Sequence, residues 1–305
     1  MNDAVVDAAY ATGWSVVRGM PEWVARRQFD AAADAIWLRS GKSVQRLKSN
    51  LARIRPDASE HDLRMLTRAG VRSYFRYWCE VFQLPKMTIE QILRRVDVEG
   101  DPRLRAAVAA GNGLVLSLPH MGNWDLAGAW LTGTGVPFTT VAERLKPESL
   151  FTRFVEFRES LGMEVIPLTG GEAPPYSILA ERLRAGGVLC LLGDRDLTTS
   201  GIEVDFFGAS ARMPAGPAAL AHDTGAALLP VTLSNPTRWR WSLSIHEQVP
   251  VPPDGDRAAK VHAMTQQVAR VFEQGIAKHP QDWHMLQRIW SADLHPGPRM
   301  QRTAV

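Results

Sequence analysis

The stretch Gly113-Leu-Val-Leu-Ser-Leu-Pro-His120-Met-Gly-Asn-Trp-Asp125-Leu-Ala-Gly-Ala-Trp130 combines a strand, a polar turn and a helix. The apolar run 114–118 is long enough for a buried strand, and Pro119 ends it because proline cannot donate a hydrogen bond to a sheet. A turn containing glycine follows, and from Trp124 the apolar residues recur at helical spacing. This order of elements is typical of the corner that carries the functional site in an α/β sheet.

The rest of the chain after residue 100 repeats this alternation of strands and helices. Further strands are predicted at residues 137–142, 163–167, 188–192, 226–233 and 239–245, and helices at 147–161, 176–185 and 257–278. The run 188–192 is apolar throughout, which indicates a central strand, whereas the alternating run 239–245 indicates an edge strand. The pattern predicts an α/β fold with a mostly parallel central sheet flanked by helices.

The first hundred residues have a helical pattern in which tryptophans and basic residues recur together. Four arginines, Arg64, Arg68, Arg72 and Arg76, follow one another at intervals of four, which places them on one side of a helix. Such amphipathic helices can lie in a membrane interface, although packing of the tryptophans into a core is the ordinary alternative. We therefore expect an N-terminal helical, membrane-associating region at 1–100 and an α/β core at 101–295, which together form one continuous domain.

Composition limits the class of protein. The chain has 305 residues, 45% of them hydrophobic, and its net charge is only +3. This charge is too small for a polycation that binds nucleic acid, and the sequence contains no recognisable base-reading module. Cys79 and Cys190 stand in apolar surroundings and are expected to be reduced core residues. Neither a membrane-spanning apolar run nor a signal peptide is expected from the sequence.

His120 is the candidate general base, because an imidazole takes up and returns a proton near neutral pH. With His120 in the turn and Asp125 in the first helical turn, we expect the carboxylate to reach back to one ring nitrogen and fix the tautomer. The alternative is a loop histidine followed by a helix-capping aspartate. No Gly-x-Ser-x-Gly motif is present in the sequence, which favours direct activation of a substrate hydroxyl.

Polar side chains follow three of the predicted strands at the point where each ends. They are His120, Glu143 and Asp194. Because ligands bind at the carboxyl ends of parallel strands, we expect these three residues to converge. The alternative is that residues 194–196 form a solvated loop with internal ion pairs.

These motifs resemble those of a known family. The spacing His120-x4-Asp125 is similar to the signature of glycerolipid and lipid A acyltransferases, and the blocks at 193–197, 204–208 and 219–231 resemble the lauroyl/myristoyl branch of that family. Segments 141–150, 157–161, 167–171 and 282–287 further resemble the actinobacterial phosphatidylinositol mannoside acyltransferases. The resemblance covers nearly the whole chain.

The resemblance implies a reaction. A palmitoyl-type acyl group passes from acyl-CoA, the co-substrate, to the 6-hydroxyl of the mannose on inositol O-2 of phosphatidylinositol mono- or dimannoside. No metal and no other cofactor is implied. It also implies a peripheral or monotopic enzyme at the cytoplasmic face of the cell inner membrane, in contact with its anionic surface.

The resemblance also implies roles for single residues. The implied catalytic residues are His120 as base, Asp125 as its orienting residue, and Asp194 at a position that is commonly Glu. Residues implied to bind the acceptor headgroup are Glu143 and His284, and those implied for acyl-CoA are Arg158, Ser200 and Asp223. Three alternatives stay open: acylation of another membrane glycolipid, an acyl-CoA thioesterase, and a non-catalytic lipid-binding protein that uses the Arg64–Arg76 side of its helix.

Overall fold

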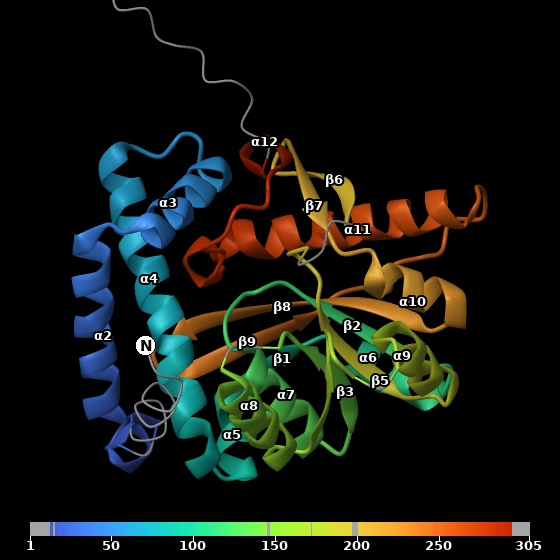
Figure 1. Ribbon diagram of the computed structural model, residues 1–305, viewed down its shortest axis with the longest axis horizontal. Coiled ribbons are helices and arrows are strands. Elements are labelled where there is room, and N and C mark those ends of the chain that lie inside the picture. The colour runs from blue at the N-terminus through green and yellow to red at the C-terminus, as the bar shows by residue number, and fades with distance from the viewer. Residues whose placement is uncertain (1–12, 15, 145–146, 172, 197–200, 295–305) are drawn as a thin grey trace, which may run out of the picture.

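Seven strands form the central sheet in the order β1-β9-β8-β2-β5-β3-β4 (Figure 1). The computed structural model describes residues 13–14, 16–144, 147–171, 173–196 and 201–294. The strands are β1 (Val96–Glu99), β2 (Leu114–Leu118), β3 (Phe138–Ala142), β4 (Met163–Pro167), β5 (Val188–Leu192), β8 (Ala227–Thr237) and β9 (Arg240–Ile245). Only β8 and β9 pair antiparallel, so the predicted α/β fold with a mostly parallel sheet is confirmed.

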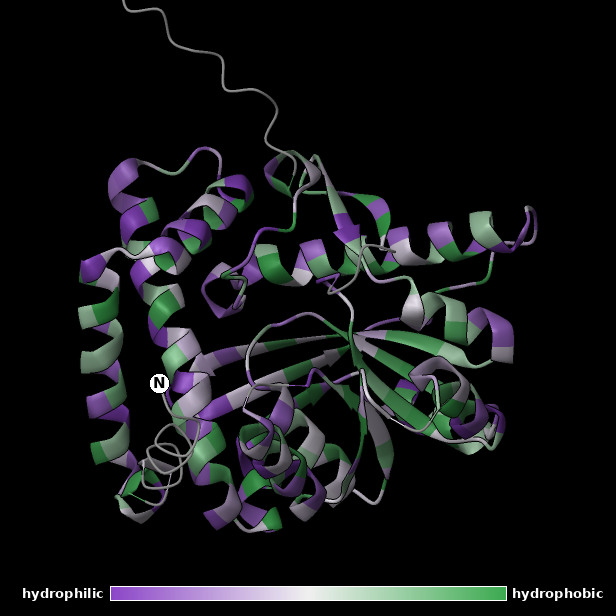
Figure 2. Ribbon diagram, viewed as in Figure 1, coloured by the Kyte–Doolittle hydropathy of each residue, from purple (hydrophilic) through white to green (hydrophobic). Residues whose placement is uncertain are grey.

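Helices cover both faces of this sheet. One face packs against α5 (Ile89–Arg95), α6 (Asp101–Ala110), α7 (Trp124–Gly133) and α8 (Glu148–Ser160), and the other against α9 (Pro175–Arg184), α10 (Gly216–Thr224) and α11 (Arg257–Lys278). Every residue of β2 is buried, yet its side chains alternate between the two layers: Val115 joins one hydrophobic cluster and Leu116 the other. Figure 2 shows β2 and β5 mainly in hydrophobic colours, whereas α11 alternates along its length.

The position of β9 in the sheet differs from the prediction. Residues 239–245 were expected to form an edge strand, but β9 lies between β8 and β1. The edge is formed by β1, whose four residues follow α5 directly and pair parallel with β9 from Val96↔Trp241 to Glu99↔Ser244. A strand this short, without a turn before it, leaves no clear period in the sequence.

Three long helices stand beside the sheet on the left of Figure 1: α2 (Glu22–Arg39), α3 (Lys42–Ile54) and α4 (Glu60–Gln83). A short 3₁₀ turn, η1 (Leu84–Lys86), links α4 to α5. Of the N-terminal helical region expected at 1–100, residues 1–12 and 15 lie outside the described residues. None of the helices in the described ranges has both the length and the apolar character needed to cross a bilayer.

The arginines at intervals of four do lie on α4, where they pair with neighbouring side chains while staying partly exposed. Arg68 and Arg72 both donate to Asp34 of α2, with Nε distances of 2.8 Å to the carboxylate. Their hydrogen bonds hold the pKa of Asp34 well below its ordinary range. Arg64 stacks 5.1 Å from the ring of Trp37 on α2, and Arg76 donates to Glu80 at 2.7 Å. This side of α4 therefore joins α4 to α2.

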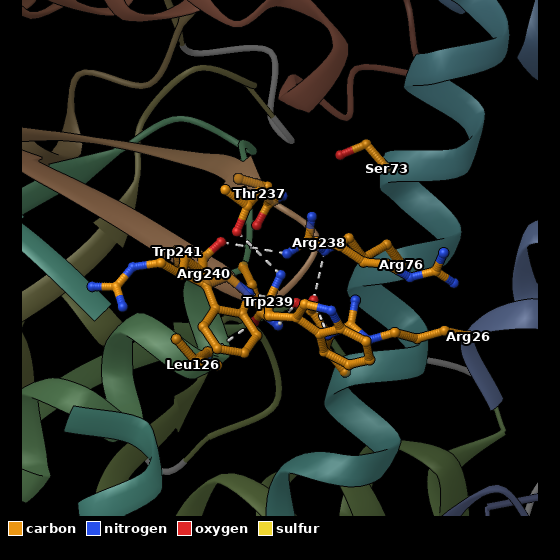
Figure 3. A network of polar contacts seen from close by, with 12 residues as sticks. Arg26, Ser73, Arg76, Leu126, Thr237, Arg238, Trp239, Arg240 and Trp241 are labelled. Carbon is orange, nitrogen blue, oxygen red and sulfur yellow. Dashed lines mark hydrogen bonds and ion pairs between the residues drawn. The ribbon is translucent and has the colours of Figure 1, made fainter. Parts of the chain in front are cut away.

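The turn between β8 and β9 docks on the same helices (Figure 3). The guanidinium of Arg26 lies 4.6 Å from the ring of Trp239, and Arg76 donates to the backbone oxygen of Arg240 at 3.4 Å. Trp241 of β9 also donates from Nε1 to the buried Glu80 of α4 at 2.8 Å, so the sheet and the N-terminal helices share contacts, and the first hundred residues contribute β1 to the sheet.

The remaining elements pack on the face of the sheet that carries α10 and α11. A hairpin of β6 (Ile202–Phe206) and β7 (Ala209–Met213), which the sequence pattern did not predict, packs against α11. The C-terminal part follows as η2 (Pro280–Asp282) and α12 (Ser291–Leu294). Between them, Trp283 forms an antiparallel bridge with Met121, which brings the end of the chain to the turn after β2.

Candidate functional site

His120 and Asp194 meet at the carboxyl end of the sheet. Strands β2 and β5 pair in parallel with Leu118 opposite Leu192, so that each of the two residues stands two positions beyond its strand. His120 Nδ1 lies 2.5 Å from Asp194 Oδ1, and the His120 backbone amide donates to Asp194 Oδ2 at 2.9 Å. A carboxylate only accepts hydrogen bonds, so Nδ1 carries a proton, and in the neutral ring the lone pair is on Nε2.

Asp194 is fully buried, and its environment favours the charged form. Trp283 Nε1 donates to Asp194 Oδ2 at 2.9 Å, in addition to the two bonds from His120. Burial alone acts to raise the pKa of this carboxyl, but His120 and Trp283 outweigh it, and the pKa lies below its ordinary value. Asp194 is therefore an ionised, buried partner of the histidine, as the expected convergence requires, and the alternative of a solvated loop does not hold for it.

Asp125 does not orient His120, which corrects the expectation from their spacing. Among the described residues its carboxylate is held by Tyr77 Oη at 2.7 Å and by Arg158 Nε at 2.7 Å. Asp125 lies in the first turn of α7, two residues after Asn123. The Asn123 side chain caps this helix by accepting from the Leu126 amide at 2.9 Å. From that position its side chain faces α4 and α8, while β5 supplies the carboxylate beside His120.

The group around Asp125 is a buried ion pair with a tyrosine. Burial acts to lower the pKa of Arg158, but Asp125 outweighs it and the pKa lies above its ordinary value. Burial, together with the charge of Asp125, raises the pKa of Tyr77 well above its ordinary value. Both side chains consequently keep their protons and act as fixed hydrogen-bond donors to Asp125.

The C-terminal segment completes the turn that carries His120. The Gly122 amide donates to the Asp282 carbonyl at 2.8 Å, and the His284 amide donates to the His120 carbonyl at 2.7 Å. Gly122 has φ +60°, and a Cβ there would lie 2.9 Å from Leu233 Cβ, so the turn requires glycine. These bonds place the buried His284 ring beside the site, where the ring of Trp124 contacts both histidines.

Glu143 also lies at this edge of the sheet. It follows β3, the neighbour of β5, and is half exposed. Arg195, which directly follows Asp194, donates to the carboxylate of Glu143 at 3.1 Å. The convergence of the three strand ends is therefore seen in the structure, with Glu143 at the outer side and Asp194 at the buried side.

Asp223, which the resemblance implies as an acyl-CoA contact, is not brought to this edge. Asp223 accepts from Arg257 and Tyr176, and it precedes β8, which starts beside Leu114 at the opposite end of β2 from His120. The hydrogen bonds of Arg257 hold the pKa of Asp223 well below its ordinary range. Ser200 lies outside the described residues.

An apolar cavity opens beside the site, between α7, α8 and the sheet. Its polar groups are few and include Asp125 and Arg158. The apolar walls come from strands and from α6 and α7, and include Leu104, Leu116, Leu118, Trp130, Phe138, Met163, Leu243 and Ile245. Cys190 also lines the cavity, and burial raises the pKa of its thiol far above the ordinary value, so it is an inert part of the wall.

Sequence reasoning missed the contribution of α4. Ser73, Tyr77 and Glu80 are spaced i, i+4, i+7 and are all buried polar residues on one side of this helix. Ser73 contacts His284, Tyr77 contacts Asp125, and Glu80 accepts from Asn123 Nδ2 at 2.9 Å. The signal in the sequence was a set of polar residues at helical spacing within an aromatic segment, Glu80 above all.

Comparison with known proteins identifies the family of the chain. A profile of the family described as bacterial lipid A biosynthesis acyltransferase matches residues 2–292. A protein of Mycobacterium tuberculosis named phosphatidylinositol mannoside acyltransferase is 50% identical over 299 residues, covering 97% of this chain and 92% of its own length. A protein of the same name from Mycolicibacterium smegmatis is 50% identical over 296 residues, covering 95% and 93%. The chain therefore belongs to the bacterial lipid A biosynthesis acyltransferase family.

Proposed function

We propose that this acyltransferase moves a palmitoyl-type acyl group from acyl-CoA to the 6-hydroxyl of the mannose on inositol O-2 of phosphatidylinositol mono- or dimannoside. The observation that carries the proposal is the His120–Asp194 pair beside an apolar cavity, whose wall includes Leu118 and Leu192, the last residues of the strands that precede the pair. The names of the two mycobacterial relatives support the class of acceptor. The role of His120 in this reaction follows from its tautomer.

His120 Nε2 is the base. It takes the proton of the sugar hydroxyl while the oxygen forms a bond to the thioester carbonyl carbon, and Asp194 stabilises the imidazolium that results. When the tetrahedral intermediate collapses, the carbon–sulfur bond breaks and the proton passes from Nε2 to the CoA thiolate. Ester and free CoA leave, and His120 is again neutral.

The cavity is suited to the acyl chain. Its walls are almost entirely apolar, and an alkyl chain gains about 0.8 kcal/mol for each CH₂ group that it buries. Arg158 lies where the cavity is polar, held by Asp125. In this proposal the thioester end of the donor lies near Arg158 and His120, which agrees with the role that the family resemblance implies for Arg158.

The acceptor headgroup then approaches from the outer side of the sheet edge. Glu143 is exposed there, and His284 lies on the C-terminal segment next to His120. We propose that both contact the sugar or inositol hydroxyls. Asp223 and Ser200 stay proposed contacts of acyl-CoA; since Asp223 lies at the other end of β2, its contact concerns a part of the donor far from the thioester.

Membrane association is the remaining part of the proposal. Trp23 and Leu38 of α2 are 60% and 67% exposed, and Ile36 on the same helix is also exposed. Large apolar side chains on an exposed helix favour insertion into a lipid interface. We place the enzyme at the cytoplasmic face of the inner membrane with α2 against the anionic lipid surface.

The experiment is acyl transfer from radiolabelled palmitoyl-CoA to purified phosphatidylinositol mono- and dimannosides, with His120→Ala beside the wild type. Label in the glycolipid that disappears in a folded His120→Ala variant supports both the acceptor and the base. Label released only as fatty acid overturns the proposal in favour of a thioesterase. Transfer to a different glycolipid in an acceptor panel, or vesicle binding without turnover, would replace it by the other two alternatives.

A further inference from the structure

Beside His120, three side chains from different parts of the chain form a hydrogen-bonded series. Ser73 of α4 has its Oγ 2.7 Å from Asp282 Oδ1 and 3.0 Å from His284 Nε2. All three residues are buried. Figure 3 shows Ser73 projecting from α4 on the side of the sheet strands.

The direction of these hydrogen bonds follows from the groups around Asp282. The Asn235 amide donates to Asp282 Oδ2 at 2.9 Å, and Asn235 Nδ2 donates to Oδ1 at 3.3 Å. The backbone amide can only donate to Oδ2, and the side-chain amide donates to Oδ1, so both oxygens act as acceptors although burial raises the pKa of Asp282. The single proton of the Ser73 hydroxyl therefore points to Oδ1. Ser73 Oγ must then accept from His284, which places the ring proton on Nε2.

His284 is consequently neutral, with a lone pair on Nδ1. Burial, together with the charges of His120 and Arg76, lowers the pKa of His284 to about 3, against a smaller opposite effect of Asp194. Within the part of the chain that the structure describes, Nδ1 is buried and has no hydrogen-bond partner. A buried acceptor without a partner is uncommon and needs an explanation.

We propose that Asp282 and Ser73 are positioning residues that hold His284 as its neutral Nε2–H tautomer, with the Nδ1 lone pair kept as an acceptor beside the catalytic His120. The inference deepens the proposed function and rests on it in one respect: His284 then meets the acceptor hydroxyls as a hydrogen-bond acceptor. A neutral His284 also adds no second positive charge when His120 takes up its proton.

One substitution should reverse the direction of the hydrogen bonds that run from His284 through Ser73 to residue 282. In Asp282→Asn, the new amide nitrogen donates to Ser73 Oγ, so the Ser73 hydroxyl turns to His284 Nε2 and the ring proton moves to Nδ1. Asn235 Oδ1 is buried and without a partner among the described residues, so its amide can turn over and accept from the new side chain. Ser73→Ala instead removes the link, and the two tautomers should mix.

The tautomer is read by long-range ¹H–¹⁵N correlation spectra of the full chain labelled with ¹⁵N-histidine. The His284 signals are assigned by their loss in His284→Gln. The matched control is Thr67→Val, which removes another buried hydroxyl of α4 that donates to the carbonyl of Leu63 in its own helix. We expect Nε2–H in the wild type and in Thr67→Val, Nδ1–H in Asp282→Asn, and a mixture in Ser73→Ala.

A wild-type His284 with the proton on Nδ1 overturns the proposal. So does an unchanged Nε2–H tautomer in folded Asp282→Asn; if that variant does not fold, an unchanged tautomer in Ser73→Ala has the same meaning. These outcomes do not depend on any substrate. An Nε2–H wild type that fails to acylate phosphatidylinositol mannosides leaves the series in place and overturns only the proposed function.

Kinetics then test the positioning role. Asp282→Asn should raise the KM for the glycolipid acceptor and lower kcat by roughly tenfold, the effect of one mismatched hydrogen bond, with the KM for palmitoyl-CoA unchanged. Thr67→Val should keep all three values. Equal kinetics of the wild type and of an Asp282→Asn variant whose tautomer has switched would overturn the positioning role.

Discussion

The Nδ1 atom of His120 lies 2.5 Å from Asp194 Oδ1, although 74 positions separate the two residues in the chain. Asp125, only five positions away from His120, binds Tyr77 and Arg158. Two carboxylates near one histidine therefore have different structural roles. Asp194 fixes the tautomer of His120, and Asp125 holds Tyr77 and Arg158 beside the apolar cavity.

Asp194→Asn should abolish most of the activity without unfolding the protein. The amide has nearly the same shape as the carboxylate but presents no charge to the imidazolium and can favour the wrong tautomer. We expect kcat to fall by roughly 10⁴-fold, as for the loss of the acid in comparable triads. The measurement is kcat for palmitoyl transfer as a function of pH, with the thermal midpoint as the control for folding.

Asp125→Asn should act on stability first. It leaves the buried Arg158 without its ion-pair partner, so the free energy of unfolding should fall by about 3 kcal/mol. The dependence of kcat on pH should keep its wild-type shape, because Asp125 does not contact His120. Urea unfolding and the pH profile check this, and a profile altered as in Asp194→Asn would contradict the separation of roles.

Gly128→Leu should shorten the acyl chain that the enzyme accepts. Gly128 lines the cavity from α7, and a Cβ there would lie 2.6 Å from Met163 Cε and 3.0 Å from Phe138 Cζ. We expect kcat/KM for palmitoyl-CoA to fall at least tenfold, about the effect of one misplaced methylene or more, while octanoyl-CoA is affected less. Gly216→Leu, in open space on α10, is the control. Equal losses for both donors would count against this use of the cavity.

His284 should make the protein less stable in acid. Its folded pKa of about 3 lies below the ordinary value of 6.5, so between these values the unfolded chain binds a proton that the folded chain does not. The free energy of unfolding should therefore rise with pH over this range, by up to about 1.4 kcal/mol per pH unit, and level off above pH 6.5. Urea unfolding of the wild type and His284→Gln between pH 5 and 8 checks this: their difference should change with pH below 6.5, and a constant difference would contradict it.

Trp23→Ser combined with Leu38→Ser should weaken vesicle binding. Both side chains are exposed on α2, and each loses apolar area that a lipid interface would bury. Sedimentation with vesicles of phosphatidylcholine and phosphatidylinositol should show at least a tenfold weaker partition. Val251→Ser removes an exposed apolar side chain elsewhere and should bind as the wild type does. Unchanged binding of the double variant would exclude α2 as the membrane-facing helix.

The sequence by itself determined the alternation of strands and helices in the α/β part, apart from β1 and the β6–β7 hairpin, and one edge of the site. The run 114–118, the turn at Gly122 and the helix from Trp124 follow from local rules, since proline, glycine and apolar period act over a few residues. The same rules located strands β4 and β5 at their observed bounds. Because parallel strands end at one edge, the convergence of His120, Glu143 and Asp194 was also predictable.

Only the tertiary structure decided which groups touch. The register of β2 against β5 places His120 beside Asp194. The packing of α4 and α8 against α7 places Tyr77 and Arg158 within hydrogen-bond distance of Asp125. The physical reason is that a hydrogen bond requires heavy atoms within about 3 Å in a defined direction. Spacing along the chain sets which edge or side of an element a residue occupies, whereas packing between elements sets its partner.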